Sequence, residues 1–158
     1  MAPAKYCETI NLRRLGILTG GGDCPGLNAV IRAIAKTAMT CFGVTVIGIE
    51  DGFEGLIEGH MHQLSNLDVS GILSLGGTIL GTSNKGDPFH YPVVETSKEV
   101  KIIDASQRAL QNYKHWNLDA LVTIGGDGSM HISQKLYELG IHVVGVPKPL
   151  TTIWRQPT

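Results

Sequence analysis

Two short glycine-rich turns, each containing one aspartate, are the residues of this sequence with the clearest chemistry. The first turn reads GGGDCPG over residues 20–26, and the second reads GGDGS over residues 125–129. Glycine allows positive φ and the close approach of a ligand to the backbone. A helix that starts just after such a turn offers unpaired N–H groups to a phosphate, and a carboxylate suits a Mg²⁺ ion carried by phosphates. The two turns therefore predict a polyphosphate site.

The elements that must hold these turns alternate between strand and helix. Apolar runs predict strands, and spacing of apolar residues by three and four predicts helices. We expect strands at 14–19, 44–49, 119–124 and 142–146, helices at 25–42, 96–116 and 129–139, shorter helical turns near 53–57 and 68–75, and a glycine-rich loop at 78–89. Pro25 would lie in the first turn of its helix, and Thr96 or Ser97 would cap the second.

This alternation predicts an α/β fold with a doubly wound, mostly parallel sheet of the Rossmann-like type. Ligands of such sheets bind at the carboxyl ends of the strands, and both glycine turns follow such ends. With 158 residues, 42% hydrophobic and 17% charged, the chain should form one globular domain.

Charge, apolar runs and cysteine content indicate which binding partners and which cellular location to expect. The net charge is −1 with no basic patch, which argues against nucleic acid as a partner. No apolar run is long enough for a signal peptide or a membrane span. The three cysteines show no CxxC spacing, as is typical of a reducing, cytoplasmic location.

Each turn also has a plainer interpretation. The first contains Gly20-x-Gly22-x-x-x-Gly26, a relaxed dinucleotide fingerprint, and Glu50 ends the next strand where a ribose-binding acid would stand. An NAD-dependent oxidoreductase domain, or a turn with no ligand, is therefore an alternative. In the second turn Asp127 could simply cap the following helix. A dehydrogenase, however, needs no second acidic glycine turn, whereas a kinase needs backbone donors and a metal-binding carboxylate.

Four ordered motifs resemble those of the phosphofructokinase family: GILTGGGDCPGLNAVIR at 16–32, GGTILGTS at 76–83, DALVTIGGDGS at 119–129 and VGVPK at 144–148. The resemblance runs from about Leu15 to Lys148. It implies an incomplete phosphofructokinase N-terminal domain. The expected organisation is an N-terminal extension at 1–13, an ATP-binding domain at 14–148 and a divergent tail at 149–158.

The resemblance also implies a role for single residues. The backbone of Gly21 would lie against the nucleotide phosphates, with Asp127 on Mg²⁺. The ATP-binding turn would comprise Gly126, Asp127, Gly128 and Ser129. Lys85 would place a positive charge against the donor phosphates, although a lysine there loses the bidentate grip of the more usual arginine. A solvated loop lysine is the alternative for Lys85.

Two positions bear on the phosphoryl donor. Family members that use pyrophosphate usually carry aspartate where this chain has Gly128, so Gly128 indicates ATP. Lys148 indicates the opposite, because many ATP users have glycine there. A mixed set of ATP users combines this glycine with this lysine, and the chain resembles those. The pyrophosphate-dependent relatives are the first alternative.

The resemblance implies transfer of the ATP γ-phosphate to the 1-hydroxyl of fructose 6-phosphate, in glycolysis, by homo-oligomers that are dimers or tetramers. The family's general base is an aspartate shortly after the Pro-Lys pair, but this chain has no Asp or Glu after Glu138. We therefore expect no catalytic base and negligible activity of the chain alone. The alternative from another class is a non-catalytic nucleotide-binding or regulatory fragment.

Overall fold

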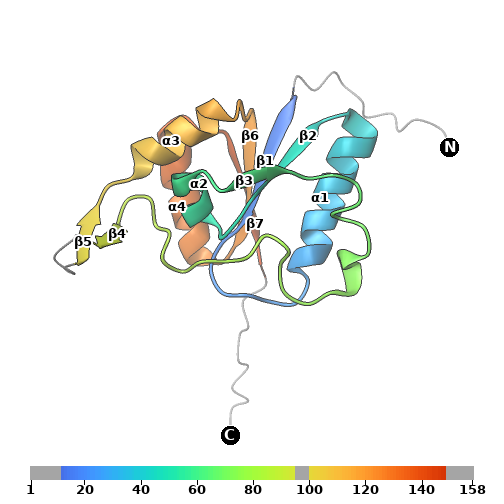
Figure 1. The fold of residues 1–158 in the computed structure, drawn as a ribbon, viewed down its shortest axis with the longest axis horizontal. Coiled ribbons are helices and arrows are strands. Elements are labelled where there is room, and N and C mark those ends of the chain that lie inside the picture. The colour runs from blue at the N-terminus through green and yellow to red at the C-terminus, as the bar shows by residue number, and fades with distance from the viewer. Residues whose placement is uncertain (1–11, 95–99, 149–158) are drawn as a thin grey trace, which may run out of the picture.

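A five-stranded sheet forms the centre of the molecule (Figure 1). The computed structural model describes residues 12–94 and 100–148. The strand order is β3-β2-β1-β6-β7, with β1 at Arg14–Thr19, β2 at Thr45–Ile49, β3 at Met61–Gln63, β6 at Ala120–Gly125 and β7 at Val143–Pro147. All neighbours are parallel except β3, which pairs antiparallel with β2 at one edge. The predicted doubly wound, mostly parallel sheet is confirmed.

Helices cover both faces of this sheet (Figure 1). Helix α1 (Leu27–Phe42) and the short 3-10 helix η1 (Ile72–Ser74) pack on one face, and α2 (Phe53–Glu58), α3 (Ser106–His115) and α4 (Asp127–Glu138) pack on the other. Successive strand side chains point to opposite faces. In β1, Ile17 therefore joins the core under α1, and Leu18 joins the core under the other three helices. Both side chains are fully buried.

Most predicted elements agree with the structure to within two residues. Gly43 ends α1 with φ 64°, as its place after the helix predicts. The start of α1 is different, because Gly26 is the N-cap, with φ 95°, and the helix begins at Leu27. Pro25 therefore precedes the helix and is not in its first turn.

The predicted helix at 96–116 is wrong in its first part. Strand β5 (Val100–Ile103) pairs antiparallel with β4 (Tyr91–Val94), and α3 begins only at Ser106. Three of the four residues in the run VKII are β-branched, which favours a strand, and Ile103 packs on the core below α2 and α3. The expected capping residues Thr96 and Ser97 lie outside the described residues. Strand β3 is not among the strands expected from the sequence.

The chain crosses the sheet in opposite directions from its two central strands. From β1 it passes through α1 to β2, and from β6 it passes through α4 to β7, on the other side. The crevice at the carboxyl ends of two strands that diverge in this way is the usual ligand site of open α/β sheets. Thr19 is in register with Ile124, so the two glycine turns begin next to each other. No helix among the described residues has the length and apolar character needed to cross a membrane.

Candidate nucleotide-binding site

The two glycine turns are in direct contact. The amide of Gly20 donates to the carbonyl of Ile124 at 2.8 Å. A Cβ on Gly20 would lie 2.5 Å from the Ser129 hydroxyl, and a Cβ on Gly125 would overlap the Ser129 side chain. Neither glycine leaves room for a larger residue. The glycines therefore let the turns approach each other, besides any contact with a ligand.

Lys148 joins the two turns a second time. Its amide donates to the carbonyl of Gly125 at 2.9 Å, and its ammonium donates to the carbonyl of Gly22. The ammonium also lies 3.5 Å from where a Cβ of Gly21 would be. Gly21 itself has φ 76°, a conformation that glycine adopts without strain. The structure thus brings Lys148 and Gly21 together, and it places the lysine charge beside the first turn.

The second turn opens α4, and its Asp127 and Gly128 are exposed to solvent. Gly126 is the N-cap of α4, so no side-chain hydrogen bond caps the helix. Asp127 is the first helical residue. Asp127 is exposed and is not the N-cap. The alternative interpretation, in which Asp127 only caps the helix, is therefore wrong. The positive end of a helix dipole favours a carboxylate in this first turn, as it favours phosphate.

Gly128 and Ser129 differ sharply although they are adjacent. No atom lies within 4 Å of where a Cβ of Gly128 would be, so the residue borders open space. Ser129 is buried, and its side chain fills the contact between Gly20 and Gly125. Gly128 therefore leaves room for a phosphate, whereas the Ser129 side chain is part of the scaffold.

The residues present fit a magnesium ion that arrives with its phosphates. Among residues 12–94 and 100–148, no three His, Cys, Asp or Glu side chains gather as a protein-only metal site. Mg²⁺ usually takes one or two carboxylates and completes its shell with phosphate oxygens and water. The exposed carboxylate of Asp127, beside the open space at Gly128, is a donor of that kind.

The loop that carries Lys85 borders the first turn. The Thr19 hydroxyl donates to the carbonyl of Gly81 at 2.7 Å, which ties the loop to the end of β1. The Asp23 carboxylate lies 3.2 Å from where a Cβ of Gly77 would be. Lys85 is exposed on this loop. The structure therefore brings the loop to the same end of the sheet as the glycine turns.

Asn28 is a site-building residue that the sequence analysis missed. Its buried amide donates to the carbonyls of Leu75 and Gly76 at 3.1 and 3.3 Å, and it accepts from the amide of Ile79 at 2.8 Å. It thereby fixes the loop before Lys85 to the first turn of α1. A polar side chain on the apolar face of α1 was the available signal.

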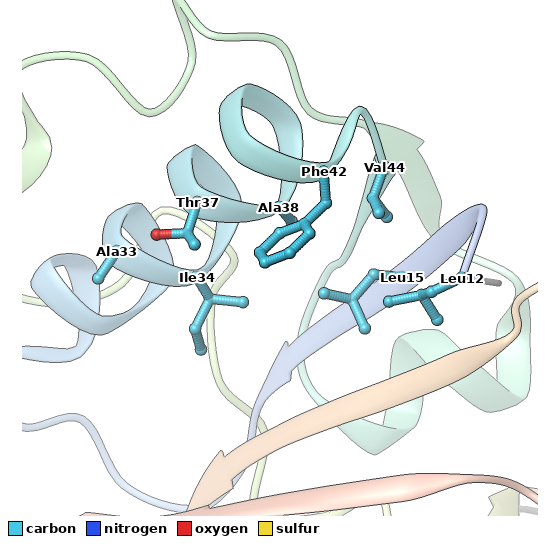
Figure 2. A pocket seen from close by; sticks show the side chains of 8 residues that line it. All are labelled: Leu12, Leu15, Ala33, Ile34, Thr37, Ala38, Phe42 and Val44. Carbon is cyan, nitrogen blue, oxygen red and sulfur yellow. The ribbon is translucent and has the colours of Figure 1, made fainter. Parts of the chain in front are cut away.

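An apolar hollow lies elsewhere on the described surface (Figure 2). It has a volume of about 410 Å³, and its lining includes Leu12, Leu15, Ile34, Phe42 and Val44. These residues come from the amino ends of β1 and β2 and from the middle and end of α1, opposite to the glycine turns. With so few polar groups, this hollow does not suit a phosphate.

Comparison with known proteins assigns the chain to a family. A family model described as phosphofructokinase matches residues 14–152. The chain belongs to the phosphofructokinase family. It is 45% identical over 139 residues to ATP-dependent 6-phosphofructokinase 2 of Clostridium perfringens, and 48% identical over 139 residues to ATP-dependent 6-phosphofructokinase of Chloroflexus aggregans. These matches cover 88% and 87% of the chain but 38% of each relative.

Solved phosphofructokinases have the same fold. The chain matches Pichia pastoris phosphofructokinase in the T-state with a TM-score of 0.68 at 28% identity, over 89% of this chain and 15% of that one. It matches the pyrophosphate-dependent phosphofructokinase of Nitrosospira multiformis with a TM-score of 0.68 at 15% identity, over 87% of this chain and 34% of that one. The second likeness concerns the fold alone. The chain thus corresponds to part of a longer phosphofructokinase architecture.

Proposed function

We propose that this chain provides the ATP-binding half of an ATP-dependent 6-phosphofructokinase. That enzyme would transfer the ATP γ-phosphate to the 1-hydroxyl of fructose 6-phosphate, giving fructose 1,6-bisphosphate in glycolysis. The observation that carries the proposal is the open space at Gly128, at the start of α4 and next to the contact between the two turns. The curated relatives named ATP-dependent 6-phosphofructokinase support it.

In this proposal the backbone holds the donor. The N–H groups of Gly21, Gly126 and Gly128 face the phosphates, where the start of α4 adds its positive dipole end. Asp127 binds Mg²⁺, which neutralises charge on the phosphate oxygens when it is bound. Lys85 adds a positive charge from the loop. Because phosphoryl transfer depends on positioning and charge, these residues are sufficient to hold and orient the donor.

ATP is the proposed donor, and pyrophosphate is the second candidate because of Lys148. In the free chain the Lys148 ammonium is bonded to the Gly22 carbonyl and lies along the first turn. The space at Gly128 remains open, so a nucleotide phosphate meets no carboxylate there. The likeness to the pyrophosphate-dependent structure quoted above, at 15% identity, concerns the fold alone and does not bear on the donor.

The substitution Gly128→Asp tests the donor assignment. A carboxylate at this position repels an ATP phosphate, so we expect ATP–Mg²⁺ affinity to fall at least about tenfold in calorimetric titration, which is about 1.4 kcal/mol. Gly128→Asn is the matched control, because it adds nearly the same bulk without charge and should cost less affinity. Equal ATP affinity of the Asp variant and the unchanged chain would contradict the assignment.

Transfer to the sugar requires a general base in addition to the donor-binding residues described above. No Asp or Glu follows Glu138, so this sequence holds no carboxylate after Lys148 to take the proton of the sugar hydroxyl. We therefore propose that the chain alone holds the donor and turns over little fructose 6-phosphate. The second candidate function is a non-catalytic nucleotide-binding or regulatory fragment that pairs with a complete subunit.

A further inference from the structure

The first turn of α2 packs against the first glycine turn. A Cβ on Gly52, the N-cap of α2, would lie 2.8 Å from the carbonyl oxygen of Thr19. The ring of Phe53, the first residue of α2, lies 3.2 Å from where a Cβ of Gly20 would be. Phe53 is buried in the core below α2. The position of this short helix is therefore fixed relative to the end of β1.

The same helical turn also holds the loop on both sides of Lys85. The Ser83 hydroxyl donates to the Glu54 carboxylate at 2.6 Å, and the same hydroxyl oxygen accepts from the amide of Lys85 at 3.2 Å. On the other side of Lys85, buried Gly86 lies against the backbone of Glu54 so closely that a Cβ would overlap its amide nitrogen. Glu54 thus contacts the loop before and after Lys85, while Lys85 is exposed.

We propose that Glu54 is a positioning residue for donor binding: through Ser83 and Gly86 it fixes the loop at 83–86, and so places the Lys85 ammonium at the donor phosphates. The inference rests on the proposed function, which assigns Lys85 to those phosphates. A side chain whose backbone is already fixed loses less freedom on binding, so the attachment to Glu54 raises donor affinity. The Glu54 carboxylate acts on the loop and not on the ligand.

Glu58 provides a matched control on the same helix. It accepts from the Tyr91 hydroxyl at 3.0 Å and pairs with Arg108 at 2.7 Å, so its partners lie on β4 and α3. Burial of the ring and the Glu58 carboxylate raise the pKa of Tyr91 to about 12, so the phenol remains a donor at neutral pH. A change at Glu58 should therefore perturb the packing of α2 without touching the loop at 83–86.

Amide hydrogen exchange of the free chain and calorimetric titration with ATP–Mg²⁺ test the inference together. With Glu54→Ala we expect faster exchange of the Lys85 amide and about fivefold weaker ATP–Mg²⁺ binding. Glu54→Gln should retain most of both, because its amide oxygen still accepts from Ser83. The Glu54→Ala effect on affinity should vanish in a Lys85→Ala background, since it acts through Lys85. Glu58→Gln should change neither quantity.

Two results would overturn the inference. One is an unchanged exchange rate of the Lys85 amide in Glu54→Ala, which shows that the Glu54 carboxylate does not fix the loop. The other is an equal loss of affinity with and without Lys85, which shows a merely structural effect of Glu54. Failure of the proposed function is a different result: the unchanged chain then shows no ATP–Mg²⁺ binding at all.

Discussion

Adjacent residues at the start of α4 have opposite roles. Asp127 and Gly128 are exposed, whereas Ser129 is buried between Gly20 and Gly125. Successive residues of a helix point about 100° apart, so one turn can present a carboxylate and an open backbone to a ligand while it packs a hydroxyl inward. The motif GGDGS therefore combines the proposed ligand contacts with a scaffold contact in five residues.

Asp127→Asn should weaken donor binding only when magnesium is present. The amide keeps the shape of the side chain but removes the charge that binds the metal, so we expect about tenfold weaker binding of ATP in Mg²⁺ and little change of ATP binding in EDTA. Titration with and without Mg²⁺ measures both. Glu138→Gln, at the exposed last residue of α4, is the control. An equal loss in the two conditions would show that Asp127 does not bind the metal.

At the scale of elements, α4 is joined to β6 by a buried chain of hydroxyls. The hydroxyls of Thr123 and Ser133 lie 2.7 Å apart, and Ser133 donates to the carbonyl of Ser129 at 2.7 Å. Buried polar groups are costly unless they are bonded, so this chain fixes the first turn of α4 in one position on the strand. It thereby supports Asp127 and Gly128, the two exposed residues that we propose face the donor.

Ser133→Ala should destabilise the fold. The change leaves the buried Thr123 hydroxyl without this partner, and we expect the free energy of unfolding to fall by about 1–3 kcal/mol in urea titrations. Gln134→Ala, at the next and exposed position, is the control and should change stability little. If both variants unfold at the same urea concentration as the unchanged chain, the hydroxyl chain does not stabilise α4.

The elements that could be predicted from sequence are those with local signals. Apolar runs and glycines predicted β1, β2, β6, β7 and both turns, because each signal lies within the element itself. Strand β3 depends on its pairing with β2, and the helix expected at 96–116 failed because the VKII run pairs with β4 across a hairpin. Within the site, the bond between Glu54 and Ser83 joins residues 29 apart and has no local signal.

At the scale of the whole molecule, the proposed account separates binding of the phosphoryl donor, by this chain, from binding and deprotonation of the sugar acceptor. The glycine turns meet at the carboxyl ends of β1 and β6, where the two crossovers diverge, and our proposal places the donor phosphates there. The chain spans 38% of the length of the curated relatives quoted above. In our proposal, the sugar phosphate and the general base lie outside this donor site.

A coupled assay on the chain alone tests this separation. With ATP, Mg²⁺ and fructose 6-phosphate we expect no turnover above background, because the proton of the sugar hydroxyl has no base. The same assay with a curated ATP-dependent relative is the positive control. Robust formation of fructose 1,6-bisphosphate by this chain would show that another group supplies the base.

Calorimetric titration of the unchanged chain with ATP–Mg²⁺ is the most direct test of the central claim, that the paired glycine turns hold a nucleotide polyphosphate. We expect saturable binding at a single site, and no binding of NADH under the same conditions. Saturable binding of NADH without binding of ATP–Mg²⁺ would contradict the claim and would assign the turns to a dinucleotide.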